Sequence, residues 1–190
     1  MTLIAGLLLA AGRGTRFGGD KLRAQLPGEP RGSTLGVVAG RHLLAALPGS
    51  VAIVRHGDGA LEADLAGVGL RIVRCASADD GMSASLACGV RATRDADGWV
   101  VALGDMPWID PATIRAVAAA IASGADIAAP SFRGTRGHPV GFARRYARDL
   151  CALTGDAGAR AIVERERASL TLIDVDDPGV LRDVDTREPS

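Results

Sequence analysis

The sequence carries no net charge, because its 22 Lys and Arg residues are matched by 22 Asp and Glu residues. Such a balance gives no overall field that would attract nucleic acid or an anionic membrane surface. A site for an anionic ligand must therefore be built from a local group of basic residues.

A long hydrophobic run is also missing. The opening segment, residues 1–11, is apolar, but it lacks a basic leading region and is shorter than the roughly 20 residues that cross a membrane. We expect it to form a buried strand of a parallel sheet. No internal repeat or low-complexity linker divides the chain, so residues 1–190 are predicted to form a single domain with a substantial core.

Cysteine is scarce. Cys75, Cys88 and Cys151 are an odd set without Cys-x-x-Cys spacing, and the chain has only three histidines. This pattern suggests neither a disulfide framework nor a structural zinc site. We expect the three side chains to be core or strand-end residues of a protein in the reducing cytoplasm.

The most informative segment is residues 7–21, where an apolar run enters a loop rich in glycine and basic residues. Glycines let backbone N–H groups turn toward an anion, and Arg13, Arg16 and Lys21 can offset phosphate charge. In an ordinary turn these three cations would repel one another. The segment predicts a triphosphate cradle, with these nucleotide-binding residues: Leu9, Ala10, Ala11, Gly12, Arg13, Gly14, Thr15, Arg16 and Lys21.

Two better-known phosphate loops do not match. A P-loop needs Ser or Thr directly after its Lys, but Leu22 follows Lys21. The dinucleotide fingerprint needs a third glycine where this chain has Phe17. The pattern Leu-Ala-Ala-Gly-x-Gly-x-Arg-Phe-Gly-x-x-Lys instead resembles the signature loop of nucleotidyltransferases with a Rossmann-like fold.

Apolar runs alternate with helical stripes along the rest of the chain. Strands are expected over 51–54, 70–73, 99–103, 126–130, 139–142 and 170–175, and helices from 35, over 83–92, after Asp110, over 143–153 and over 157–167. This order predicts a three-layer α/β sandwich, with a Rossmann-like, mostly parallel sheet that becomes mixed in its C-terminal part.

Two carboxylates are candidate magnesium ligands. Asp105 follows the strand expected over 99–103, and the carboxyl ends of parallel strands form the ligand-binding edge. Mg²⁺ needs only one or two carboxylates, with waters and phosphate oxygens. Asp185 in the C-terminal tail is the second candidate, since Thr186 and Pro189 suggest a turn back over that edge. The structural alternatives are a turn residue for Asp105 and a solvated terminus for Asp185.

Four motifs occur in a characteristic order: the Leu-Ala-Ala-Gly loop, Gly81-Met82-Ser83-Ala84-Ser85-Leu86, Leu103-Gly104-Asp105-Met106-Pro107 and Asp183-Val184-Asp185-Thr186. With Gly137-His138-Pro139-Val140 and residues 155–160, this set resembles the molybdenum cofactor cytidylyltransferases over nearly the whole chain. The resemblance implies a molybdopterin nucleotidyltransferase-like NTP transferase domain of the nucleotide-diphospho-sugar transferase type. It also implies transfer of CMP from CTP to the phosphate of molybdopterin, with Mg²⁺ as cofactor.

In this mechanism Arg16, Lys21 and Asp105 are the catalytic residues, and no Ser–His–Asp or Cys–His arrangement is needed. Ala11 favours CTP, because Leu-Ala-Gly-Gly accompanies guanosine use in the family. Ser83 and Ser85 are expected to read the base or ribose, with helix capping by Ser83 as the alternative.

Three further residues are candidates for the acceptor site. His138 either contacts the pterin or lies in a solvent-facing loop. Asp156 and Arg160 either form a pair that shapes the acceptor pocket or simply start a helix.

Other readings stay open. The same fold could use GTP or another phosphorylated acceptor, or the protein could be a molybdenum cofactor escort with little catalysis. The resemblance further implies a molybdenum hydroxylase of the xanthine dehydrogenase class as a transient partner.

Overall fold

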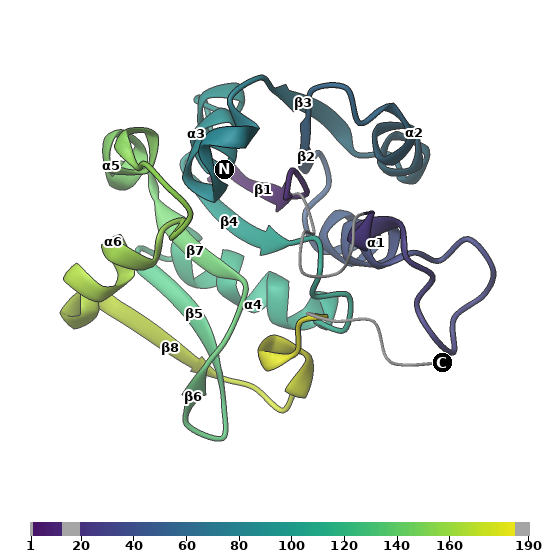
Figure 1. Ribbon diagram of the computed structural model, residues 1–190. Coiled ribbons are helices and arrows are strands. Elements are labelled where there is room, and N and C mark those ends of the chain that lie inside the picture. The colour runs from purple at the N-terminus through teal and green to yellow at the C-terminus, as the bar shows by residue number, and fades with distance from the viewer. Residues whose placement is uncertain (1, 13–19, 185–190) are drawn as a thin grey trace.

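The computed structural model describes residues 2–12 and 20–184. Its centre is an eight-stranded sheet in the order β3-β2-β1-β4-β7-β5-β6, with β8 paired to β5 (Figure 1). The strands are β1 (Ile4–Leu9), β2 (Val51–Arg55), β3 (Arg71–Cys75), β4 (Gly98–Leu103), β5 (Ile127–Phe132), β6 (Thr135–Arg136), β7 (Val140–Ala143) and β8 (Leu170–Asp174).

The first four strands form a parallel unit. β1 lies between β2 and β4, and β3 pairs with the outer side of β2. The apolar runs of β1, β2 and β4 are almost entirely buried, as expected for strands covered on both faces.

The second half of the sheet is mixed, which confirms the predicted change of direction. β7 runs antiparallel to β4 and β5, whereas β8 runs parallel to β5. Because β7 is reversed, it begins at the edge where the parallel strands end. His138 therefore comes to the same edge as Asp105.

Six α-helices of the described chain cover the sheet: α1 (Leu35–Ala46), α2 (Gly59–Val68), α3 (Met82–Ala92), α4 (Pro111–Ala122), α5 (Ala147–Ala152) and α6 (Arg160–Arg165). Alternate strand residues feed two cores. Leu8 and its neighbours pack against α1, α2 and α4, and Leu7 packs with α3, α5 and α6 on the other side. This confirms the three-layer α/β sandwich (Figure 1).

Short 3-10 turns connect these elements: η2 (Lys21–Arg23), η3 (Ala78–Asp80), η4 (Arg144–Tyr146), η5 (Arg167–Ser169) and η6 (Pro178–Leu181). α5 and α6 are shorter than the predicted helices over 143–153 and 157–167. Gly155 and Gly158 explain the late start of α6, because both have positive φ and a helix cannot begin until they have passed.

Two predicted helix starts have different outcomes. The Asp110 side chain accepts from Ala112 N ahead of Pro111, so that predicted cap is confirmed. The alternative role of Ser83 as a cap is wrong, since Gly81 is the N-cap of α3. Gly81 has φ 108°, and a Cβ there would lie 2.5 Å from the Gly155 carbonyl oxygen, so the chain enters α3 in a way that requires glycine.

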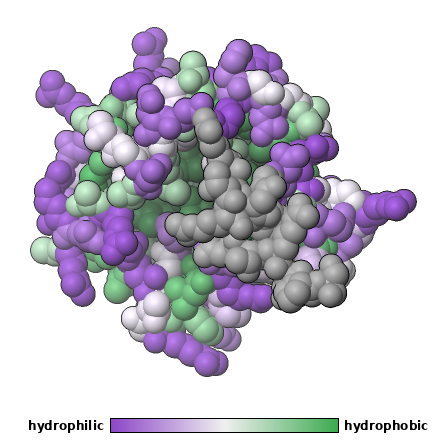
Figure 2. All heavy atoms as spheres, viewed as in Figure 1, coloured by the Kyte–Doolittle hydropathy of each residue, from purple (hydrophilic) through white to green (hydrophobic). Residues whose placement is uncertain are grey.

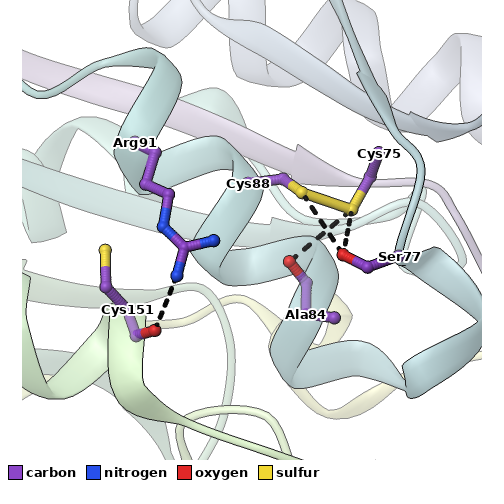
Figure 3. The surroundings of a disulfide bond; sticks show 6 residues. All are labelled: Cys75, Ser77, Ala84, Cys88, Arg91 and Cys151. Atoms are coloured by element: carbon purple, nitrogen blue, oxygen red, sulfur yellow. Dashed lines mark hydrogen bonds between the residues drawn. A yellow bond between two sulfur atoms is a disulfide. The ribbon is translucent and has the colours of Figure 1, made fainter.

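The expectation for the cysteines needs a correction. Cys75 at the end of β3 and Cys88 in α3 form a disulfide, with Cα atoms 5.9 Å apart (Figure 3). The reason is tertiary: α3 packs back over β3, and the resulting Cα separation is one that a disulfide can bridge. A spacing of 13 residues did not reveal this. Cys151 is a free thiol.

The helices of the structure bear on the prediction that the chain lacks a membrane-spanning segment. Within residues 2–12 and 20–184, none of the helices has the length and apolar character needed to cross a bilayer.

Candidate active site at the carboxyl edge of the sheet

Two predicted catalytic residues meet at the carboxyl edge of β1 and β4. Leu9 and Leu103 are register partners, so the chain leaves both strands at the same level. Lys21 Nζ lies 2.8 Å from Asp105 Oδ2, although 84 residues separate the two positions in sequence. The predicted placement of Asp105 beside the exit of the glycine loop is confirmed by this ion pair.

Local packing sets the position of this pair. Gly104 N–H donates to Leu9 O at 3.0 Å, and a Cβ on Gly104 would lie only 3.0 Å from the Leu22 side chain. The absence of a side chain at Gly104 thus lets η2 approach the end of β4. Buried Leu22 anchors η2, and Lys21 reaches Asp105 from it.

The exposure of the pair leaves room for a ligand. The Lys21 and Asp105 side chains are 12% and 26% exposed. Asp105 Oδ1 has no hydrogen-bond partner in the described part of the chain, and no described backbone N–H donates to this carboxylate. The structure therefore does not support the alternative of a purely turn-satisfying role.

This donor set fits Mg²⁺ bound together with a nucleotide. Mg²⁺ takes one or two carboxylates and completes its shell with waters and phosphate oxygens, and Asp105 has an oxygen available for it. No cluster of three His, Cys, Asp or Glu side chains with metal-site spacing occurs among residues 2–12 and 20–184. Asp105 is thus a carboxylate that fits a shared protein–phosphate site.

The C-terminal segment reaches this edge at Val184, whereas the turn predicted from Thr186 and Pro189 lies outside the described residues. Val184 N–H donates to Asp105 O at 3.1 Å, and the Arg182 guanidinium lies 4.2 Å above the Trp108 ring. Asp185, the second predicted metal ligand, lies outside the described residues and directly follows Val184.

The described part of the glycine segment is a continuation of β1. Leu9, Ala10 and Ala11 are buried, and Ala10 N–H donates to Ile53 O at 2.9 Å. Among the described residues, leaving out Gly12 and its chain neighbours, no heavy atom lies within 4 Å of a Cβ built on Gly12. Arg13, Gly14, Thr15 and Arg16 lie outside the described residues.

Sequence reasoning missed Arg55. Its Nη2 donates to Ala11 O at 2.8 Å, and its Nη1 pairs with the Asp79 carboxylate. Arg55 ends β2, next to β1, so its place after a buried parallel strand was the available signal. The contact connects Ala11, which was predicted to bind nucleotide, with η3, the turn that precedes the predicted base-reading serines.

The predicted base-reading serines are buried at the start of α3. Ser83 Oγ donates to Thr154 O at 3.2 Å and Ser83 N–H donates to Gly155 O at 3.1 Å. These bonds connect α3 to the loop at 154–155. Ser85 is also buried, and a nucleotide contact by either serine stays a prediction.

His138 is partly buried at the start of β7 rather than solvent-facing, and a cis peptide bond joins it to Pro139. Its Nδ1 is buried and has no hydrogen-bond partner in the described chain. Burial lowers the pKa of His138, Arg136 lowers it further, and Asp105 acts in the opposite direction. A neutral imidazole near Asp105 suits a hydrogen bond to a ligand.

The predicted Asp156–Arg160 pair is not formed. Arg160 begins α6 and pairs with Glu164 at 2.7 Å. The Asp156 carboxylate instead packs against Gly81. The loop that carries Asp156 therefore supports the start of α3.

Figure 2 shows one face of the molecule, on which hydrophobic residues lie recessed among hydrophilic side chains. Apolar surface with a few convergent polar groups is the usual lining of a small-molecule site.

Comparison with known proteins agrees with this geometry. The chain is 27% identical over 199 residues to the purine catabolism protein PucB of Bacillus subtilis, covering 97% of this chain and 93% of that protein. The crystal structure of Rv0371c from Mycobacterium tuberculosis superposes with a TM-score of 0.82 at 28% identity, covering 97% of this chain and 94% of that one. Rv0371c has also been crystallised in complex with manganese.

A nucleotidyl transferase from Methanothermobacter is similar as well, with a TM-score of 0.79, 26% identity, and coverage of 98% of this chain and 93% of that one. A Leptospira cytidylyltransferase, at 14% identity and a TM-score of 0.73, shares the fold. The model of the MobA-like NTP transferase domain matches residues 6–170. With the glycine segment and Asp105 both inside that span, the chain belongs to the MobA-like NTP transferase family of nucleotidyltransferases.

Proposed function

We propose that this protein transfers CMP from CTP to the phosphate of molybdopterin, forming molybdopterin cytosine dinucleotide and pyrophosphate. The observation that carries the proposal is the ion pair between Lys21 and Asp105 at the carboxyl edge. It joins a cation suited to phosphates and a carboxylate suited to a metal within 2.8 Å, beside the end of the glycine segment.

In the proposed step a phosphate oxygen of the acceptor attacks the α-phosphorus of CTP. The bond from that phosphorus to the bridging oxygen breaks, and pyrophosphate leaves with the electron pair. Lys21, together with Arg13 and Arg16, holds the β- and γ-phosphates and matches the charge on the leaving group. Such reactions depend mainly on positioning and charge stabilisation, so no covalent nucleophile from the protein is required.

Asp105 is the proposed protein ligand for a divalent cation, with Asp185 as a second. When bound, Mg²⁺ would neutralise charge on the triphosphate. The manganese complex of the related Rv0371c supports a divalent ion in this fold. Lys21, which pairs with Asp105 in the free protein, would then turn to the phosphates.

The choice of CTP rests on Ala11, which is buried just beyond the end of β1. A methyl group at this point shifts base preference by about 1–3 kcal/mol unless hydrogen bonds also change. Ser83 and Ser85 are proposed to contribute by shaping the start of α3.

The molybdopterin acceptor is supported by the ordered motifs and by the relative named for purine catabolism. Xanthine is a purine, so that name agrees with a molybdenum hydroxylase of the xanthine dehydrogenase class as recipient. His138 is proposed to contact the acceptor, while Asp156 acts indirectly by supporting the start of α3.

The test is pyrophosphate release. The purified protein is incubated with molybdopterin-type cofactor, Mg²⁺ and either CTP or GTP, and the dinucleotide product is identified by mass spectrometry. We expect release with CTP and cofactor together, and none when either is omitted. An Arg74→Met protein, altered on the exposed outer part of β3, serves as the folded control.

The other outcomes identify the alternatives. Release with GTP would assign guanylyl transfer, and release only with a sugar phosphate or methylerythritol phosphate would assign another acceptor. Cofactor binding without pyrophosphate from either nucleotide would contradict the proposal and favour an escort.

A further inference from the structure

Arg55 connects two segments of the chain that are far apart in sequence. Its guanidinium donates to Ala11 O at 2.8 Å through Nη2 and pairs with Asp79 through Nη1. The Arg55 side chain is 23% exposed, whereas its partner Asp79 is 56% exposed, so the contact with Ala11 is the more sheltered of the two. One planar group thus holds the end of β1 and the turn η3 that precedes α3.

The contact with Ala11 orients the peptide that follows it. In a trans peptide the C=O and the next N–H point in opposite directions. With its oxygen held by Arg55, the Ala11–Gly12 peptide directs the Gly12 N–H away from Arg55. Among the described residues beyond its chain neighbours, none has a heavy atom within 4 Å of a Cβ built on Gly12.

The contact with Asp79 acts on the other segment. The segment 79–83 is also fixed from the opposite side, because Gly81 packs against Gly155 and Ser83 bonds to the loop at 154–155. Arg55 fixes it from the side of β1. The segment 79–83 therefore lies between the loop at 154–155 and the end of β1.

We propose that Arg55 is a positioning residue for the nucleoside part of the nucleotide, and this inference rests on the proposed function. By spanning Ala11 and Asp79 it sets the separation between the two segments that face the base and ribose. It does not contact the phosphates. Arginine suits this role because its rigid fork can bind two acceptors at once, which the single ammonium group of lysine does less well.

The experiment compares ligands that do and do not need a base site. Binding of CTP, GTP and inorganic pyrophosphate is measured by titration calorimetry with Mg²⁺ for the wild type and for Arg55→Met and Arg55→Lys. Pyrophosphate probes only the phosphate cradle. We expect Arg55→Met to weaken CTP binding by about tenfold or more, the scale of a lost hydrogen bond to a charged group.

The affinity for pyrophosphate should change by less than about twofold, because this ligand has no nucleoside part for Arg55 to position. Arg55→Lys should fall between wild type and Arg55→Met, because it keeps the charge and one contact. In the transfer assay the KM for CTP should rise while kcat changes little, and the CTP-to-GTP preference should shrink.

Arg74→Met is the matched control. Arg74 lies on β3 beside β2 and pairs with Glu62. The Arg74→Met substitution therefore removes a comparable guanidinium–carboxylate pair away from the glycine segment. If Arg55→Met does not fold, Asp79→Asn tests the same contact from a side chain that is 56% exposed.

Two results would overturn the inference: unchanged CTP affinity in Arg55→Met or Asp79→Asn, or equal weakening of CTP and pyrophosphate. A wild-type protein that binds none of the three ligands would instead overturn the proposed function. The two failures are therefore distinguishable.

Discussion

The two halves of the sheet present different chemistry at one edge. Where β1 and β4 end, Lys21 and Asp105 form a partly exposed ion pair. Beyond β7, the C-terminal half instead has the buried carboxylate of Asp177, which accepts from Asp110 N–H, Thr113 Oγ1 and Gly179 N–H. Both sites hold a carboxylate, but only one is accessible.

The difference separates a ligand site from a structural one. A carboxylate with three internal donors is satisfied, and its hydrogen bonds tie η6 to the start of α4. The Lys21–Asp105 pair is instead partly exposed, and Asp105 keeps an oxygen without a described partner, so this carboxylate is available to a ligand. We therefore expect changes to the first site to affect activity and changes to the second to affect folding.

The largest effect is expected for Asp105→Asn. This change keeps the shape and a bond to Lys21 but removes the charge that would hold a metal. Metal-dependent nucleotidyl transfer should fall by about a thousandfold, since a bound cation contributes several kcal/mol of charge stabilisation. Steady-state pyrophosphate release measures this, and an unchanged melting curve shows that folding is intact. Near-normal turnover would remove Asp105 from the metal role.

Lys21→Met should lower kcat by about a hundredfold, the usual scale for removing one charge-stabilising donor. Lys21 is the single lysine of the chain, so reductive methylation with ¹³C-formaldehyde labels one side chain besides the N-terminal amine. Its NMR signal should shift when CTP and Mg²⁺ are added and Lys21 leaves Asp105. A signal that does not respond to nucleotide would contradict the exchange of partners.

Asp177→Ala should reduce the free energy of unfolding by about 2–4 kcal/mol, because three donors, two of them in buried bonds, lose their acceptor. Urea denaturation measures the loss. Asp149→Asn, which removes an exposed pair with Arg165, is the control and should cost less than about 1 kcal/mol. Pyrophosphate affinity should be unchanged in the folded Asp177→Ala protein; a large change there would break the distinction between the two halves.

The smallest effect concerns pH. The folded pKa of His138 is lowered from the ordinary value of 6.5, so the unfolded chain binds its proton first as the pH falls. The associated stability is present above about pH 6.5 and is lost toward the lowered folded pKa. His138→Gln should flatten the decline of Tm across this window. A decline as steep as in the wild type would exclude His138 as its source.

Much of the fold could be predicted because its determinants are local. The buried strands have continuous apolar runs, and the Asp110–Pro111 pair marks the start of α4 by its own capping chemistry. The ends of α5 and α6 were harder to predict, because the glycines at 155 and 158 interrupt a helical pattern without removing it.

The candidate site divides in the same way. The chemistry of Asp105 could be predicted from its place after a strand, whereas Arg55 was missed because one arginine after a strand carries no distinctive pattern. The burial of Asp177 could not be predicted either, because it depends on hydrogen bonds from Asp110 and Thr113 at the start of α4. The disulfide between Cys75 and Cys88 could not be predicted, since spacing along the chain does not reveal how α3 folds back onto β3.

The sequence by itself determined the alternation of strands and helices, the glycine segment and the carboxylate at the end of β4, since each depends on residues close together in the chain. Only the tertiary structure decided that Lys21 reaches Asp105, that Arg55 spans Ala11 and Asp79, and that Asp177 is enclosed. These contacts depend on strand order and register, which bring residues together that no local periodicity relates.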